Sequence, residues 1–158
     1  MVSIPNEKFY LEHRTRENQN IFLLRGTIDE DTTFDEIAKY QGPYVFNFKE
    51  ITSINSCGVR SWVNFIKSLG KQSVAYEECP PVIVRQMNMV PSFVGPANVL
   101  SVYVPYVCDG CDTEKTVLVN RSQFSGKLQI ASSFPCDSCK KNEMVVDGQP
   151  DQYFAFLK

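Results

Sequence analysis

Residues 44–48 form a short run of β-favouring, mostly apolar side chains directly after the Gly42-Pro43 dipeptide. Two polar residues, Asn47 and Lys49, fall on alternate positions of the run. Alternation with a period of two is typical of a strand that is buried on one face. The pattern therefore predicts a half-buried strand here.

A second pattern begins after a turn at residues 54–58, where apolar side chains recur at intervals of three and four. This spacing keeps one face of a helix apolar. The residues of the stripe are Val59, Trp62, Val63, Ile66 and Leu69. Asn55 or Ser56 can cap the start of this helix, and Gly70 fits the left-handed position past its end.

The turn between this strand and helix resembles the central motif of the STAS domain, the fold of bacterial anti-sigma-factor antagonists. In that family an aspartate, a serine, a serine or threonine and a glycine open the second helix. The same four places here are Asn55, Ser56, Cys57 and Gly58.

The order of the other elements is also similar to that family over roughly the first two-thirds of the chain. The matching segments are a strand at 21–29, a helix at 34–40, a strand at 73–77, a helix at 82–90 and a last strand at 99–104. The resemblance implies an α/β domain over residues 1–104, with a mixed β-sheet and helices packed on it.

The residue before the motif glycine differs from the family pattern. In relatives that act as switches, a partner kinase phosphorylates a hydroxyl at this place, and Cys57 offers a thiol instead. Ser56 is a candidate phosphorylation site one residue earlier, about 100° away around the helix, and its hydroxyl could equally cap the helix. A thiol at a helix start can be a reactive thiolate, but we expect Cys57 to be a small buried side chain.

The resemblance also implies a docking face for a protein partner at the start of the second helix and on the neighbouring helix. By position, this face comprises Ser56, Cys57, Arg60, Ser61, Asn64, Gln86 and Met89. The implied partner is an anti-sigma factor or a serine kinase, and a homodimer is a further option. Some relatives bind nucleotides or lipids, so a small-ligand binder is an alternative.

The composition changes after residue 104, where two C-x-x-C pairs follow each other. Cys108 and Cys111 form the first pair, and Cys136 and Cys139 the second. Four thiolates from two tight turns match the tetrahedral preference of Zn²⁺, and a site closed by four cysteines stabilises a fold without catalysing hydrolysis. This segment, residues 105–158, resembles a zinc ribbon.

Other interpretations of these cysteines remain open. The gap of 24 residues between the pairs exceeds the commonest spacing of about 15 to 20. The pairs could instead serve a redox sensor that exchanges metal for disulfides, although neither pair precedes a helix as in thioredoxin. For the layout, we expect a β-hairpin from strands at 116–119 and 128–131, while residues 153–157 add a late strand or dock on the core.

Charge and motifs exclude several functions. With 16 basic and 18 acidic residues, a net charge of −2 and a pI near 5.4, the chain does not resemble a binder of nucleic acid or anionic membranes. It shows no membrane span or export signal, so we expect a cytoplasmic protein. The single histidine, His13, is expected to face solvent, and no P-loop, dinucleotide-binding or hydrolase motif occurs, which predicts a non-enzymatic protein.

Overall fold

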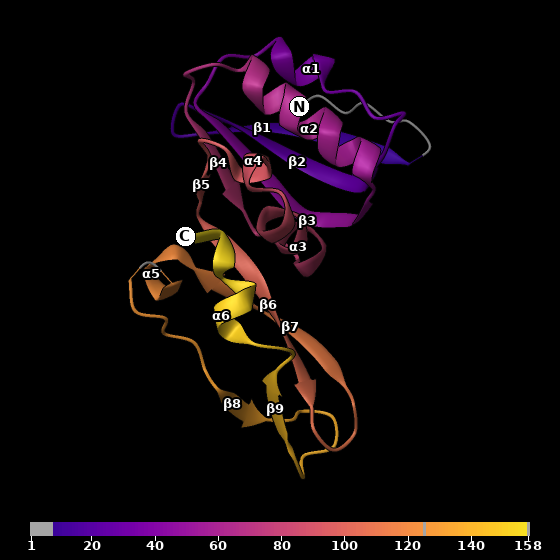
Figure 1. Ribbon diagram of the computed structural model, residues 1–158, viewed down its shortest axis with the longest axis vertical. Helices are drawn as coiled ribbons and strands as arrows, with labels where there is room; N and C mark the ends of the chain where they lie inside the picture. Colours follow the sequence, from indigo (N-terminus) through magenta and orange to yellow (C-terminus); the bar gives the residue numbers. More distant parts are fainter. Residues whose placement is uncertain (1–7, 125, 158) are drawn as a thin grey trace.

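The first of two sheets contains five strands among the residues that the computed structural model describes, 8–124 and 126–157 (Figure 1). Its spatial order is β1-β2-β3-β4-β5. β1 pairs antiparallel with β2 and the other neighbours pair in parallel, so the predicted mixed sheet is confirmed. The strands are β1 Phe9–Arg16, β2 Gln19–Ile28, β3 Tyr44–Ile54, β4 Val74–Glu77 and β5 Asn98–Val99.

From β2 onwards helices alternate with these strands along the chain, which confirms the predicted α/β class. They are α1 Asp35–Ala38, α2 Ser56–Ser68, α3 Pro81–Met89 and α4 Pro91–Val94. α2 lies across the sheet in Figure 1 and is the longest of them. Among the described residues, no helix is both long and apolar enough to cross a membrane.

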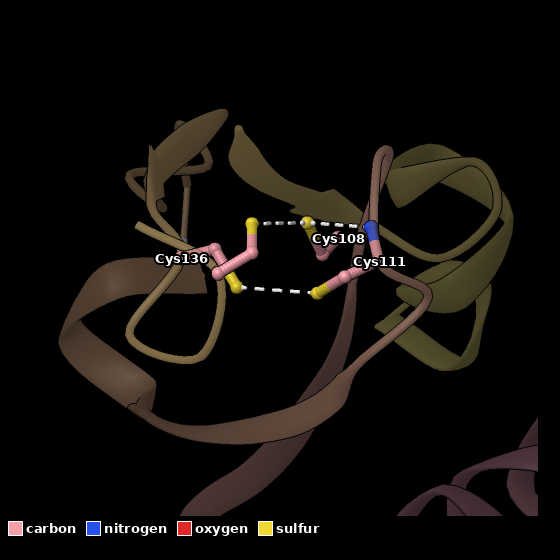
Figure 2. A group of neighbouring side chains, drawn as sticks. Cys108, Cys111 and Cys136 are labelled. Carbon is pink, nitrogen blue, oxygen red and sulfur yellow. Dashed lines mark hydrogen bonds between the residues drawn. The ribbon is translucent and has the colours of Figure 1, made fainter. Parts of the chain in front are cut away.

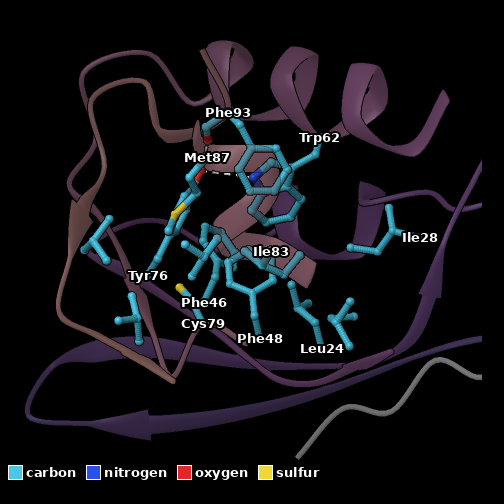
Figure 3. Packing of buried hydrophobic residues seen from close by; sticks show 14 of the residues in the cluster. Leu24, Ile28, Phe46, Phe48, Trp62, Tyr76, Cys79, Ile83, Met87 and Phe93 are labelled. Carbon is cyan, nitrogen blue, oxygen red and sulfur yellow. Dashed lines mark hydrogen bonds between the residues drawn. The ribbon is translucent and has the colours of Figure 1, made fainter. Parts of the chain in front are cut away.

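Trp62 lies at the centre of the core between the sheet and the helices (Figure 3). Its ring centroid is 5.0 Å from that of Phe46 and 5.3 Å from that of Phe48, both on β3. The indole N–H donates to the Tyr76 hydroxyl at 3.0 Å, and that hydroxyl donates to the Phe93 carbonyl at 2.6 Å. The polar atoms buried with these rings are therefore hydrogen-bonded, as a stable core requires.

The start of α2 is fixed by a cap and by a glycine. The side chain of Asn55 accepts a hydrogen bond from the Gly58 amide at 2.8 Å, so Asn55 and not Ser56 caps the helix. A Cβ on Gly58 would lie 2.3 Å from the carbonyl oxygen of Ile28, at the end of β2. Only glycine lets the helix approach the strand this closely. At the other end, Gly70 has φ of +63°, as predicted.

We expect Gly58→Ala to destabilise the protein by about 1–3 kcal/mol, because a backbone carbonyl cannot move aside as a flexible side chain can. Alanine is otherwise the better helix former, by about 1 kcal/mol, so propensity alone predicts stabilisation. Urea unfolding measures the difference. Asn64→Ala, at an exposed position of the same helix, is the matched control and should change stability little. A Gly58→Ala variant as stable as the wild type would show that the close approach of α2 to the Ile28 carbonyl does not require glycine.

The second sheet is antiparallel throughout and has the order β7-β6-β9-β8. Its strands are β6 Ser101–Cys108, β7 Glu114–Asn120, β8 Ser133–Pro135 and β9 Glu143–Val146. The predicted strand at 116–119 is part of β7. In Figure 1 this sheet extends away from the first one, and β6 leads into it.

The predicted last strand at 99–104 is wrong, because it joins pieces of two sheets. β5 ends at Val99, and β6 continues through Pro105 to Cys108, across the expected boundary at 104. Pro105 looked like the end of a strand because it lacks an N–H. The Pro105 carbonyl accepts a hydrogen bond from the Asp147 amide, on the side of β6 that faces β9. The paired ladder between β6 and β9 begins only at Tyr106, so the missing N–H of Pro105 removes no hydrogen bond from it.

The C-terminal segment also differs from the expected hairpin. Residues 128–131 form no strand, since β9 occupies the free edge of β6. The expected late strand at 153–157 is replaced by helical turns, α6 Pro150–Tyr153 and η1 Ala155–Leu157, which follow the short helix α5 Arg121–Phe124 in the chain. The alternative expectation, docking on the core, is confirmed: Phe154 is buried, and the Tyr153 carbonyl accepts from Asn88 of α3 at 3.0 Å.

Cys79 and His13 lie in or near the core. Cys79 is completely buried, and burial raises the pKa of its thiol. His13 is half-buried on β1, with its ring 4.1 Å from that of Tyr40 and a 2.8 Å hydrogen bond to Asn20. The expectation that His13 faces solvent is therefore wrong, because the tyrosine ring covers it.

Candidate functional site

The first cysteine pair lies in the turn between β6 and β7. The carbonyl of Cys108 accepts a hydrogen bond from the Asp112 amide at 3.2 Å, and Asp112 closes the turn with φ of +61°. The amides of Gly110 and Cys111 both donate to the sulfur of Cys108, at 3.4 Å. A Cβ on Gly110 would lie 1.9 Å from the side chain of Asn142, so this turn packs closely on the second one.

The second cysteine pair repeats this geometry after β8. The carbonyl of Cys136 accepts from the Lys140 amide at 3.0 Å, and Lys140 has φ of +58°. The Cys136 amide donates to the Asn142 carbonyl, also at 3.0 Å. Each pair thus lies on a turn closed by a bond from the fourth following residue, which has a left-handed backbone.

The two turns bring all four predicted metal ligands together. The sulfurs of Cys108 and Cys139 are 3.7 Å apart, as are those of Cys111 and Cys136, and all four lie within 4.8 Å of one another. Figure 2 shows the sulfurs of the labelled cysteines directed towards a common centre. Cys108 and Cys136 are buried, Cys139 is half-buried and Cys111 is exposed. The cluster could hold a metal ion.

Backbone amides set different proton affinities for these thiols. The amides of Lys141 and Asn142 face Cys139 and lower the pKa of its thiol to about 6. At Cys108 the amides of Cys111 and Gly110 favour the thiolate, but desolvation and the neighbouring thiols outweigh them and raise the pKa to about 11. Backbone amides therefore favour the thiolate at Cys139, whereas burial and the neighbouring thiols favour the protonated form at Cys108; metal binding requires thiolates and so releases protons.

A groove of about 460 Å³ lies at a second place, between α2 and the α3–α4 segment. Its lining residues are Ser56, Val59, Arg60, Val63, Asn64, Lys67, Gln86, Met89, Val90 and Ser92. Five of the seven residues expected on the docking face are among them: Ser56, Arg60, Asn64, Gln86 and Met89. The structure therefore gathers these five around one hollow.

The other two residues of the expected face, Cys57 and Ser61, do not line the groove. Cys57 is exposed, so the expectation of a small buried side chain is wrong. The buried face of α2 begins at Gly58 and Val59. The side chain of Cys57, one residue before Gly58, is rotated by about 100° around the helix axis. Ser56 is exposed as well, and Asn55 already caps the helix, so capping does not account for the serine hydroxyl.

Sequence reasoning missed half of the groove. Val59 and Val63 were assigned to the core, and they are buried while also forming part of the groove wall. The spacing of Arg60 and Lys67, seven residues apart, was a signal that both lie on one helix face. The contribution of Ser92 depends on α4, which no pattern in the sequence predicted.

We compared the chain with family models, curated proteins and solved structures, and none of them matches. Function must therefore be inferred from the two places described above. One is a cluster of four cysteine thiols, and the other is an open groove between helices.

Proposed function

We propose that the chain is a non-enzymatic regulatory module that binds a protein partner through the α2–α3 groove, in the manner of STAS-domain anti-sigma-factor antagonists. The observation that carries this proposal is the groove itself, whose lining includes five of the seven residues placed on the docking face by resemblance. Its exposed edge carries Met89, which is 68% exposed. A flexible, polarizable side chain of this kind suits an adaptable protein interface.

In this proposal the residue that is phosphorylated differs from that of the family's usual switch. Cys57 stands where relatives carry a phosphorylated hydroxyl, and its thiol is exposed. Ser56 is exposed at the mouth of the groove and would place a phosphate directly beside a docked partner. The partner class that we propose is an anti-sigma factor or a serine kinase, acting in the cytoplasm of a bacterium.

The four-cysteine cluster supplies a structural zinc site in the same proposal. Four sulfurs at about 2.3 Å from a tetrahedral centre are about 3.8 Å apart, because a tetrahedron edge is about 1.6 times the centre-to-vertex distance. The two Sγ to Sγ distances of 3.7 Å match this spacing. Disulfide sulfurs would be about 2.05 Å apart, so the cluster fits metal better than oxidised pairs. Four cysteine ligands leave no open position for catalysis.

A photo-crosslinking experiment tests the docking face. Met89 is replaced by a photoreactive phenylalanine analogue, and the full chain is irradiated in an extract of its own cells. We expect one dominant protein adduct. The control carries the same analogue at Tyr10, which is 40% exposed on β1, away from the groove, and should give none. Equal adducts from both positions, or none from position 89, would contradict a docking role for this groove.

A thiol-based redox sensor is the second candidate, supported by one observation. Cys111 is exposed, so an oxidant can reach the cluster without unfolding the protein. The cross-turn pairs, Cys108 with Cys139 and Cys111 with Cys136, are the closest sulfurs and would form the disulfides once metal leaves. Metal analysis combined with thiol counting separates this candidate from a structural site, as described in the Discussion.

A further inference from the structure

The helices around the groove carry charge of one sign. α2, α3 and α4 contain Arg60, Lys67 and Arg85 but no aspartate or glutamate, although the chain has 18 acidic residues. All three cations are exposed. None of the three forms an ion pair within the described residues, whereas Arg14, Arg16 and four other basic side chains do. Arg60 and Lys67 line the groove, whereas Arg85 lines a separate hollow that Asp147 also lines. The positive charge of the groove itself therefore comes from Arg60 and Lys67.

Two of these cations frame the apolar part of the groove along α2. Arg60 and Lys67 are seven residues apart, which is two turns or about 10.5 Å along the helix axis. Val63 lies between them on the same face, and Val59 and Val90 also line the hollow. The wall thus presents charge, apolar surface and charge in succession.

We propose that the groove binds an acidic amphipathic helix, an inference that rests on the proposed function and specifies the partner's chemistry. Such a helix places two apolar side chains over Val63 and its valine neighbours and one carboxylate near each of Arg60 and Lys67. On a partner helix, positions i, i+3, i+4 and i+7 share one face. The recognised pattern is acidic residues at the outer two positions and apolar residues at the inner two.

Other anionic macromolecules fit the groove less well. A membrane surface or a nucleic acid needs several phosphate contacts, and three cations on a protein of net charge −2 provide few. The apolar wall between Arg60 and Lys67 would contact neither a headgroup nor a phosphate. An apolar helix face, by contrast, buries surface there and contributes affinity that salt does not screen.

A displayed peptide library tests this inference. The library presents helical peptides in which positions i, i+3, i+4 and i+7 are randomised, and it is selected on the full chain. The same selection is repeated on the double variant Arg60→Glu/Lys67→Glu. The matched control is Lys49→Glu/Lys71→Glu, which makes the same change of net charge at exposed positions outside the groove. The affinity of selected peptides is then measured by fluorescence anisotropy at low and high salt.

We expect the wild type and the control to select acidic outer and apolar inner positions, and the Arg60→Glu/Lys67→Glu variant to select basic outer positions. A peptide selected on the wild type should bind that variant at least about tenfold more weakly, and high salt should reduce the difference. No enrichment, or the same outer charges on all targets, would overturn the inference.

Two further outcomes separate the explanations. Phosphatidylglycerol vesicles or duplex DNA that bind the wild type better than any selected peptide, through the same two cations, would also overturn it in favour of that macromolecule. A partner that crosslinks to position 89 but ignores the charge reversal would leave the proposed docking function intact and remove only the acidic helix. If neither the crosslinking nor the peptide library gave a specific binder, both the docking function and the acidic helix would be contradicted.

Discussion

Removing the metal from the proposed zinc site is expected to unfold the second sheet and to destabilise the whole protein. The cluster lies at the end of β6. In the first turn two backbone amides donate to the sulfur of Cys108, and in the second the side chain of Asn142 donates to the sulfur of Cys139. Structural zinc in small domains contributes apparent free energies of about 10–16 kcal/mol at pH 7, which is comparable to the total stability of a typical protein. No other single change to this molecule should have a larger effect.

The measurement combines metal analysis, thiol counting and limited proteolysis. Protein purified without chelator should contain one zinc per chain, and chelation should make residues 109–147 sensitive to protease. Cys136→Ser should lose the metal, whereas Cys57→Ser, a thiol outside the cluster, should keep it. In the loaded native protein only the exposed Cys57 should react with a thiol reagent, and Cys79 should react only after denaturation.

Two results would contradict the structural zinc site. Absence of metal with all four cluster thiols freely reactive would remove it and leave the docking groove as the main feature. Disulfides without metal would instead favour the redox sensor, and the expected pairs are then Cys108 with Cys139 and Cys111 with Cys136. Reversible metal release by peroxide would support the same alternative.

Trp62→Ala should lower the stability by about 3–5 kcal/mol, the typical cost of removing a large buried aromatic side chain. The ring is completely buried and touches aromatic side chains from β3, from α4 and from the residue that precedes α1. The substitution also leaves the Tyr76 hydroxyl without its donor. For a chain of this size the loss corresponds to a fall in melting temperature of about 6–20 °C.

Circular dichroism is the appropriate measurement, because Trp62 is the single tryptophan and its fluorescence disappears with it. Trp62→Phe is the matched variant: it keeps an aromatic ring but loses the hydrogen bond to Tyr76, and it should cost less. If Trp62→Ala melted within a few degrees of the wild type, this core would not depend on its central ring.

The elements that were predicted correctly are those whose sequence pattern and packing agree. α2 has an unbroken apolar stripe, a capping asparagine and a left-handed glycine at its end, so three independent signals place it. The C-terminal segment has no such agreement. Residues 153–157 alternate too briefly to separate a strand from a helical turn, and Pro150 at the start of α6 decides in favour of the helix.

The candidate sites differ in the same way. The four cysteines are close in pairs along the chain, and a tight turn must bring each pair together, so the cluster could be predicted from spacing. The groove depends on how α3 and α4 pack beside α2, which is a property of the tertiary structure. Its residues could be placed only through a resemblance, and that approach also included Cys57 and Ser61, which do not line the groove.

The absence of acidic residues from α2, α3 and α4 also affects how a charged partner approaches the molecule. All 18 acidic side chains lie elsewhere in the chain, so the charged side chains on these three helices are all positive and create a positive local field. At physiological salt this field extends about 8 Å from the surface. An acidic segment that comes within this distance of the three helices is attracted by their cations. The charge distribution thus selects the direction of encounter before any contact forms, and it affects association rates more than affinity.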